Sequence, residues 1–188
     1  MSQEIQHYFT IFADDFGVFD SHTYDWFLHP VVTPTAIKEM RHHYQLPRTI
    51  ATYNALFDRV NKATLDYLTV NFAGRHTGRQ FLLALQDEMQ GKTPLAYNNK
   101  ILIKILHRLK FDVSDFIRYY HFAQSSLIKE QKNFHSEHLT TLPSTLIYFK
   151  DDVMMVDALA QRQIFAFLNE KTAERESSAV FLSRLTVS

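Results

Sequence analysis

The chain has 188 residues, a mass of 22.1 kDa and a formal net charge of zero, and 46% of its residues are hydrophobic. This length and composition predict one folded domain and exclude a chain that is disordered throughout. The sequence contains no cysteine, which excludes a disulfide scaffold, a thiolate zinc site, an iron–sulfur cluster and a cysteine nucleophile. Residues 1–7 are polar without a cationic start and no segment reaches about 18 apolar residues, so we expect a cytoplasmic protein without a signal peptide or membrane span.

Two stretches near the ends of the chain have the pattern of short strands. Residues 8–20 are aromatic and β-branched around the pair Asp14 and Asp15, which predicts a β-hairpin within residues 1–30. Residues 144–157 have a similar pattern around another Asp-Asp pair and predict a second hairpin. The two hairpins could pair into one small sheet at one end of a helical body, or the similarity is that of two unrelated apolar turns.

Between these stretches, residues 34–132 have the pattern of a helical core. Thr33 stands before a proline at a first helical position and predicts a helix start. Apolar residues recur every three or four positions, which predicts helices over residues 34–46, 47–72, 78–90, 100–110 and 114–133. Asn99 and Ser114 are the expected caps of the last two. The helix over 100–110 is apolar around most of its circumference, so we expect it at the centre of the fold.

Two further helices are expected over residues 158–171 and 178–185. The small numbers of glycines (4) and prolines (5) also favour long helices over a sandwich or barrel. The sequence therefore predicts a mainly α fold. We expect a single compact domain over residues 1–188, with about seven helices and one or two short β-hairpins near the termini.

The charges are distributed unevenly along the chain. Residues 1–37 carry five acids and no lysine or arginine (−5), residues 38–132 carry 15 cations and 8 acids (+7), and residues 133–188 carry 5 cations and 7 acids (−2), which together make zero. A basic middle between acidic ends suits an anionic partner, or a chain whose ends pack against its own middle.

A basic stripe lies within this middle region. Lys100, Lys104 and Arg108 are spaced four residues apart and share one helix face, where like charges repel. An anionic ligand or the acidic ends of the chain would relieve that repulsion. Alternatively, the lysine stems cover a buried helix and place their ammonium groups in water.

Residues 91–116 resemble the last two helices of phage-repressor-type helix-turn-helix domains, in which a Gly-Lys loop with a proline precedes an apolar helix and a Val-Ser-x-x-Phe cap. Such domains place one helix in the major groove of DNA, so the resemblance implies a small nucleic-acid-binding regulator. Phosphate or base contacts would then come from the basic side chains Lys38, Arg41, Arg48, Arg75, Arg79, Lys100, Lys104 and Arg108.

Two alternatives remain open. The aromatic clusters at residues 24–27, 119–122 and 165–167 suit a helical module that binds a protein partner or a second copy of itself. The run Ala13-Asp-Asp-Phe-Gly17 resembles the N-terminal metal motif of YdjC-type sugar deacetylases, which implies a metal-dependent hydrolase with a ligand or base at Asp14 or Asp15, joined by His22 or His29. For the regulator we expect no cofactor and no catalytic residue.

Overall fold

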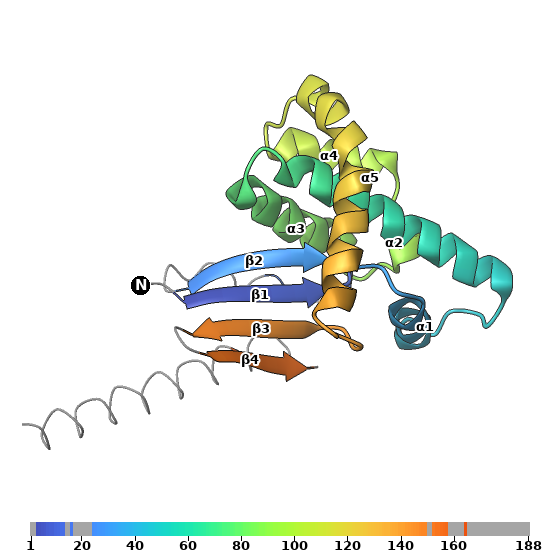
Figure 1. The fold of residues 1–188 in the computed structure, drawn as a ribbon. Helices are drawn as coiled ribbons and strands as arrows, with labels where there is room; N and C mark the ends of the chain where they lie inside the picture. Colours follow the sequence, from blue (N-terminus) through green and yellow to red (C-terminus); the bar gives the residue numbers. More distant parts are fainter. Residues whose placement is uncertain (1–2, 14–15, 17–23, 150–151, 158–163, 165–188) are drawn as a thin grey trace, which may run out of the picture.

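A mixed four-stranded sheet forms the centre of the computed structural model, which describes residues 3–13, 16, 24–149, 152–157 and 164. The strand order is β2-β1-β3-β4 (Figure 1). β1 (Gln3–Phe9) runs parallel to β2 (Tyr24–Pro30) and antiparallel to β3 (Ser144–Phe149), and β4 (Asp152–Asp157) is antiparallel to β3. The first and third strands therefore lie side by side in the sheet although most of the chain separates them.

The helices are inserted between β2 and β3. They are α1 (Pro34–His43), α2 (Ile50–Asn71), α3 (Arg75–Met89), the short 3-10 helix η1 (Pro94–Ala96), α4 (Asn99–Arg108) and α5 (Val113–Ser136). Figure 1 shows α5 passing the carboxyl ends of β1 and β2, so that it returns the chain to the sheet. Within the described ranges, every helix is too short or too polar to span a bilayer.

The prediction of a compact mainly α domain of about seven helices is wrong, and so is the hairpin predicted within residues 1–30. β1 and β2 lie parallel, with a register from Gln3 opposite Tyr24 to Phe9 opposite Pro30, whereas a hairpin would pair them antiparallel. Parallel neighbours need a connection of about a dozen residues or more, and residues 10–23 separate these two strands in the sequence. A short apolar strand shows in the sequence that it is extended, but it does not show which strand it will pair with, because that pairing is non-local.

The second predicted hairpin, over residues 144–157, is confirmed and belongs to the same sheet. β3 and β4 are an antiparallel pair from Ser144 opposite Asp157 to Phe149 opposite Asp152, and β3 also pairs with β1. The helices predicted over residues 158–171 and 178–185 lie outside the described residues, apart from the single position Ile164.

Local capping signals explain where several helices begin. The Thr33 side chain accepts a hydrogen bond from the backbone N–H of Ala36, as predicted for the start of α1. Asn98 caps α4 and Asp112 caps α5, one and two residues before the predicted caps Asn99 and Ser114. α4 also lies nearer the surface than predicted, since only Leu102, Ile105 and Leu106 of it are buried.

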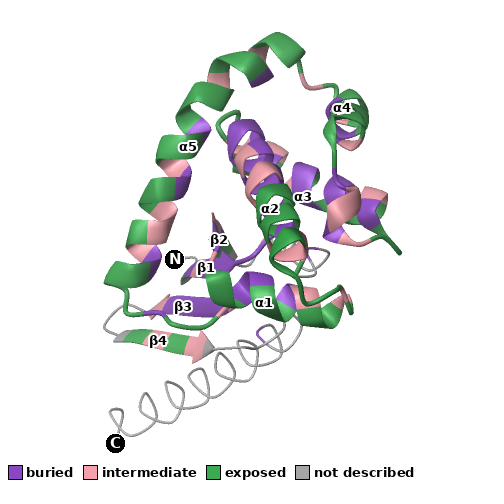
Figure 2. Cartoon of the chain, turned by 90° about the vertical axis from the view of Figure 1, so that its right-hand side faces the viewer, coloured by how far each residue is buried: buried purple, intermediate pink, exposed green. Residues whose placement is uncertain are grey.

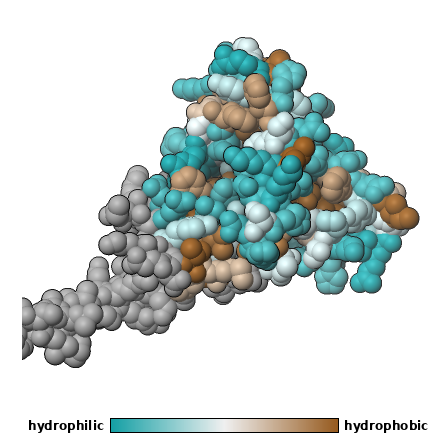
Figure 3. All heavy atoms as spheres, in the orientation of Figure 1, coloured by the Kyte–Doolittle hydropathy of each residue, from teal (hydrophilic) through white to brown (hydrophobic). Residues whose placement is uncertain are grey.

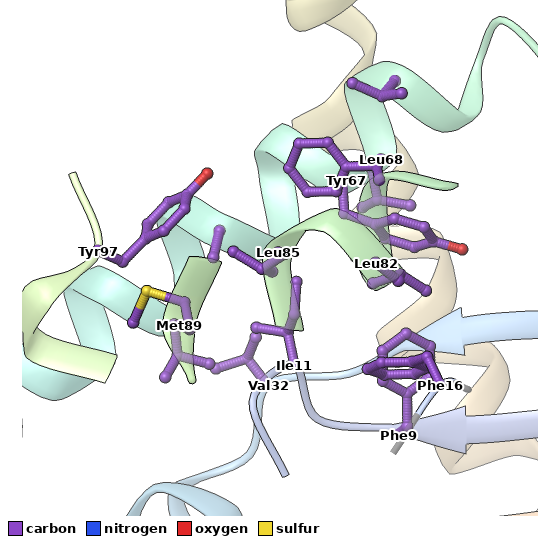
Figure 4. Packing of buried hydrophobic residues seen from close by; sticks show 14 of the residues in the cluster. Phe9, Ile11, Phe16, Val32, Tyr67, Leu68, Leu82, Leu85, Met89 and Tyr97 are labelled. Atoms are coloured by element: carbon purple, nitrogen blue, oxygen red, sulfur yellow. The ribbon is translucent and has the colours of Figure 1, made fainter. Parts of the chain in front are cut away.

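Apolar side chains cover both faces of the sheet. On one face Ile5, Phe9 and Ile147 join the main core, which α2 and α3 complete. Figure 4 shows Phe9 beside Phe16, and their ring centroids are 5.0 Å apart. On the other face Tyr8 and four other buried residues form a smaller cluster that includes Phe134 of α5. Figure 2 shows the resulting pattern, with buried residues on β3, α2 and α3, whereas β4 is exposed or intermediate.

Candidate functional site

A cavity of about 240 Å³ lies where the carboxyl end of β1 meets the amino end of β3. The antiparallel pairing of β1 with β3 brings these two strand ends together, and α1 follows β2 onto the same edge. Three segments that are far apart in the sequence therefore line the cavity: Thr10, Phe12 and Ala13 after β1, Ala36, Glu39, Met40, His43 and Tyr44 of α1 and its end, and Leu142 and Pro143 before β3.

The loop before β3 offers unpaired backbone groups beside this cavity. The peptide bond between Leu142 and Pro143 is cis. The Ser144 hydroxyl donates a hydrogen bond of 2.7 Å to the carbonyl of Thr141, which holds the loop against the strand. Within the described part of the chain, the backbone N–H and C=O of Leu142 have no hydrogen-bond partner. An extended ligand can therefore pair with the backbone here, as a strand does at a sheet edge.

One face of α1 forms a wall of the cavity. Ala36, Met40 and His43 lie at helical spacings of four and three, so their side chains share one side of the helix. Ala36 is small and apolar, and Met40 is apolar and flexible. Glu39 and His43 are exposed and add polar groups at the rim. The wall thus combines apolar contact area with a carboxylate that can accept hydrogen bonds from a ligand N–H or ammonium group.

Phe12 and Tyr44 form a further wall of the cavity. The Tyr44 hydroxyl donates a hydrogen bond of 3.4 Å to the carbonyl of Phe12, and burial raises the pKa of this phenol, so it stays a neutral donor. Phe12 has a φ of 72°, in the left-handed region that a bulky side chain rarely adopts. Backbone strain of this kind persists where the surrounding structure holds it, and it occurs frequently at functional sites.

A larger groove continues from this wall. Phe12 and Tyr44 also line a hollow of about 720 Å³, together with residues from the carboxyl end of α3 and the segment 90–94. Leu82, Leu85 and Met89 form its apolar side, and Figure 4 shows these three residues along α3. The cavity and the groove share one wall, so an elongated ligand could contact both.

The structure does not bring the predicted basic residues together on one face. Lys104 of α4 forms an ion pair of 2.7 Å with Glu88, and Arg108 forms one of 2.8 Å with Asp87. Both acids belong to α3, which packs beside α4, so the chain itself neutralises two of the three charges in the basic stripe. Lys100 lies in a separate hollow beside Arg59 and Lys62.

The remaining predicted contacts fall into two groups. Lys38, Arg41 and Arg48 line an open basic hollow at the end of α1. Arg75 and Arg79 line a different cavity, beside β2. These charges therefore lie in two separate places, along and just after α1 and at the start of α3.

The other sequence candidates are also dispersed. Asp14, Asp15 and His22 lie outside the described residues, while His29 contacts Glu130 of α5. Within the described ranges there is no group of three or more histidine, aspartate or glutamate side chains that could hold a metal ion.

The predicted aromatic clusters have different environments. Trp26 is buried in the main core, whereas Phe122 is 58% exposed and packs with Phe72 on the surface, at a centroid distance of 6.0 Å. The cluster at residues 165–167 lies outside the described ranges. Figure 3 shows a largely hydrophilic face over the helices, with separate hydrophobic residues scattered on it.

Sequence reasoning missed the cavity at the end of β1. Its signal was weak: a Leu-Pro pair immediately before the apolar run of β3, and a helix whose apolar face continues into His43 and Tyr44. Only the pairing of β1 with β3 shows that these segments meet.

Comparison with known proteins places this geometry in a family. A family model described as thioredoxin matches residues 26–161, more than half of the chain. A "putative protein disulfide isomerase" from Nitrosomonas europaea has a similar structure, with a TM-score of 0.64, 11% identity and coverage of 93% of this chain and 99% of that one. No curated protein sequence matches the chain.

The cytosolic disulfide reductase DsbM from Pseudomonas aeruginosa is also similar. Its TM-score is 0.58 at 12% identity, with coverage of 90% of this chain and 98% of that one. The structure of that reductase with GSH has a TM-score of 0.57 at 12% identity and covers 90% of this chain and 99% of that one. At these identities the likeness establishes the fold.

These findings overturn the functional predictions made from the sequence. Residues 91–116, which resemble part of a helix-turn-helix domain, belong to the helical insertion of a thioredoxin-like fold, so the prediction of a nucleic-acid-binding regulator is wrong. The same comparisons favour neither of the two alternatives, the helical interaction module and the metal-dependent hydrolase at Asp14 and Asp15. Binding of a protein partner stays a prediction. A short turn between two helices is common in any helical segment and is a weak indicator of function.

Proposed function

The chain belongs to the thioredoxin family, and on this basis we propose that it is a binding protein that holds an extended peptide, such as a thiol tripeptide, in the cavity at the end of β1. Thioredoxin-type disulfide exchange uses a Cys-x-x-Cys dithiol. This chain contains no cysteine. It therefore has no thiol with which to form a mixed disulfide, and any sulfur chemistry in the cavity would have to use the thiol of the ligand.

The observation that carries the proposal is the unpaired backbone of Leu142 beside the cavity. An extended peptide can donate to the carbonyl and accept from the N–H of this residue, which gives affinity without dependence on side-chain sequence. Ala36 and Met40 provide apolar contact, and the Glu39 carboxylate can accept from a ligand ammonium group. The similar Pseudomonas reductase has been seen with GSH, a tripeptide with these groups, which supports the choice of ligand class.

Titration with reduced glutathione tests the proposal directly. We expect saturable binding in calorimetry, with amide shifts in an NMR titration concentrated at Thr10, Ala13 and Leu142. The variant Ala13→Trp fills the exposed mouth of the cavity and should weaken binding at least tenfold. The matched control Thr35→Trp adds the same side chain at an exposed position of α1 that does not line the cavity, and should leave binding unchanged.

Two results would contradict this function. One is the absence of saturable binding both to glutathione and to a short unstructured peptide. The other is an equal loss of affinity in Ala13→Trp and Thr35→Trp. An insulin reduction assay without added thiol should show no turnover, because the chain has no cysteine to supply electrons.

We also infer a cytoplasmic location. The description of the similar Pseudomonas protein as cytosolic supports it. Fractionation of cells that express the tagged chain would test this inference, and recovery in the membrane or periplasmic fraction would contradict it.

A further inference from the structure

A second cavity, of about 250 Å³, lies against the edge strand β2 of the sheet. No described strand pairs with the outer edge of β2. Residues of α2, α3 and α5 line the cavity on this side of the sheet. The cavity is lined by Trp26, Phe27, Leu28 and His29 of β2, Tyr67 and Asn71 of α2, Arg75 and Arg79 of α3, and Glu130 of α5. Residues from both faces of β2 contribute, so the cavity wraps around the strand edge.

A histidine with one unsatisfied nitrogen forms part of this cavity. His29 Nδ1 lies 2.7 Å from Glu130 Oε2, and the imidazole stacks on Tyr8 with a centroid distance of 4.7 Å. These two contacts hold the ring in position. The other ring nitrogen, Nε2, is buried and has no hydrogen-bond partner among the described residues. Buried polar atoms without partners are rare, and an unfilled position beside a cavity is where a ligand atom would be expected.

Two arginines add positive charge to the same cavity. Arg75 and Arg79 lie one helical turn apart at the start of α3. The guanidinium of Arg75 lies 4.3 Å from the centroid of the Phe27 ring, which orients its plane, and it forms no ion pair with any described residue. Among the described lining residues Glu130 is the only acid, and His29 already contacts its carboxylate. The Arg75 guanidinium therefore lies beside a carboxylate that is already engaged.

We propose that this cavity binds a small flat molecule, such as an aromatic one, that carries a carboxylate or phosphate group. The Arg75 guanidinium would take the oxyanion in a charge-assisted hydrogen bond, for which its planar fork is suited. His29 Nε2 would form a hydrogen bond with a further polar atom of the ligand. Phe27, Trp26 and Tyr67 would contact its apolar part. This site is separate from the cavity at the end of β1, so it does not depend on the function proposed above.

Three matched probes test the proposal: phenyl phosphate, benzoate and uncharged phenol. We expect saturable binding of at least one anion, with amide shifts around residues 26–29 and 71–79, and much weaker binding of phenol. The anion that binds more tightly identifies the preferred group. Arg75→Met should weaken its binding about tenfold or more, since hydrogen bonds to charged groups are among the strong ones.

Control variants make the test specific. Arg118→Met removes an exposed arginine of α5 that pairs with Asp115 and does not line the cavity, and it should bind the anion within twofold of the unaltered protein. His29→Gln should weaken binding while thermal melting shows a folded protein. The proposal is overturned if neither anion saturates, if phenol binds as tightly as the anions, or if Arg75→Met and Arg118→Met lose affinity equally.

Discussion

Replacement of Tyr97 by phenylalanine should destabilise the protein by about 2 kcal/mol at neutral pH, because it deletes a hydrogen bond to a buried carboxylate. Asp66 is fully buried in α2, and its Oδ2 accepts from the Tyr97 hydroxyl at 2.8 Å and from Lys62 Nζ at 2.6 Å. The other oxygen, Oδ1, is buried without a partner among the described residues. The substitution keeps the ring and its packing, so the loss is that of the hydrogen bond.

The pH dependence gives this prediction a second readout. Burial raises the pKa of Asp66, although hydrogen bonds from Lys62 and Tyr97 and the charge of Lys62 lower it. Because the folded pKa lies above the unfolded value, the folded state holds the proton more tightly. The contribution of this group to stability is therefore greatest at low pH and is lost as pH rises through the folded pKa. Without the Tyr97 hydroxyl the pKa rises further, so the penalty should be larger at pH 7 than at pH 4.

Urea denaturation followed by circular dichroism at pH 4, 5.5 and 7 measures both effects. Tyr97→Phe removes one hydroxyl group and no other atom. A control is Tyr119→Phe, which removes a hydroxyl whose hydrogen-bond donor, Arg118, is exposed. It should change the free energy of unfolding by less than about 0.5 kcal/mol, as surface substitutions usually do. A loss below 0.5 kcal/mol for Tyr97→Phe, or a loss that does not vary with pH, would refute the reasoning.

Three further predictions concern packing, capping and charge, and the same unfolding assay checks each. Gly78→Ala should cost about 1–3 kcal/mol, since a Cβ there would overlap the side chain of Asn71; a neutral result would mean that Asn71 moves aside. Thr33→Ala should cost about 1 kcal/mol because the α1 cap is lost, whereas Thr33→Ser should retain most of the stability that the cap provides. Lys104→Met should cost less than about 1 kcal/mol because Lys104 is 69% exposed in its ion pair with Glu88, and a larger loss would contradict that view.

Much of the helical part of this protein can be predicted from local sequence signals. Thr33 followed by a proline marks the start of α1 because a hydroxyl there satisfies a backbone N–H that the helix leaves open. The helix predicted over residues 47–72 is continuous as α2 from Ile50 to Asn71. Burial of Leu56, Val60 and Ala63 against the core explains this continuity, since tertiary packing outweighs a weak local preference.

The charge pattern was informative but incomplete. The sequence places Lys104 and Arg108 on one helix face, which the structure shows as well. It does not place Glu88 and Asp87 opposite them, because those acids lie on another helix and the contact depends on how α3 packs beside α4. An apparent binding surface in the sequence is here largely an internal charge balance.

By itself, the sequence determined that this is a folded domain rich in helix, where most of its helices lie, and that it holds no cysteine thiol. Only the tertiary structure decided the sheet order and both cavities. Leu142 and Pro143 meet Phe12 and α1 because β1 pairs with β3, and His29 meets Glu130 because α5 passes the end of β2. Such contacts join residues more than a hundred positions apart, and no local propensity or spacing encodes them.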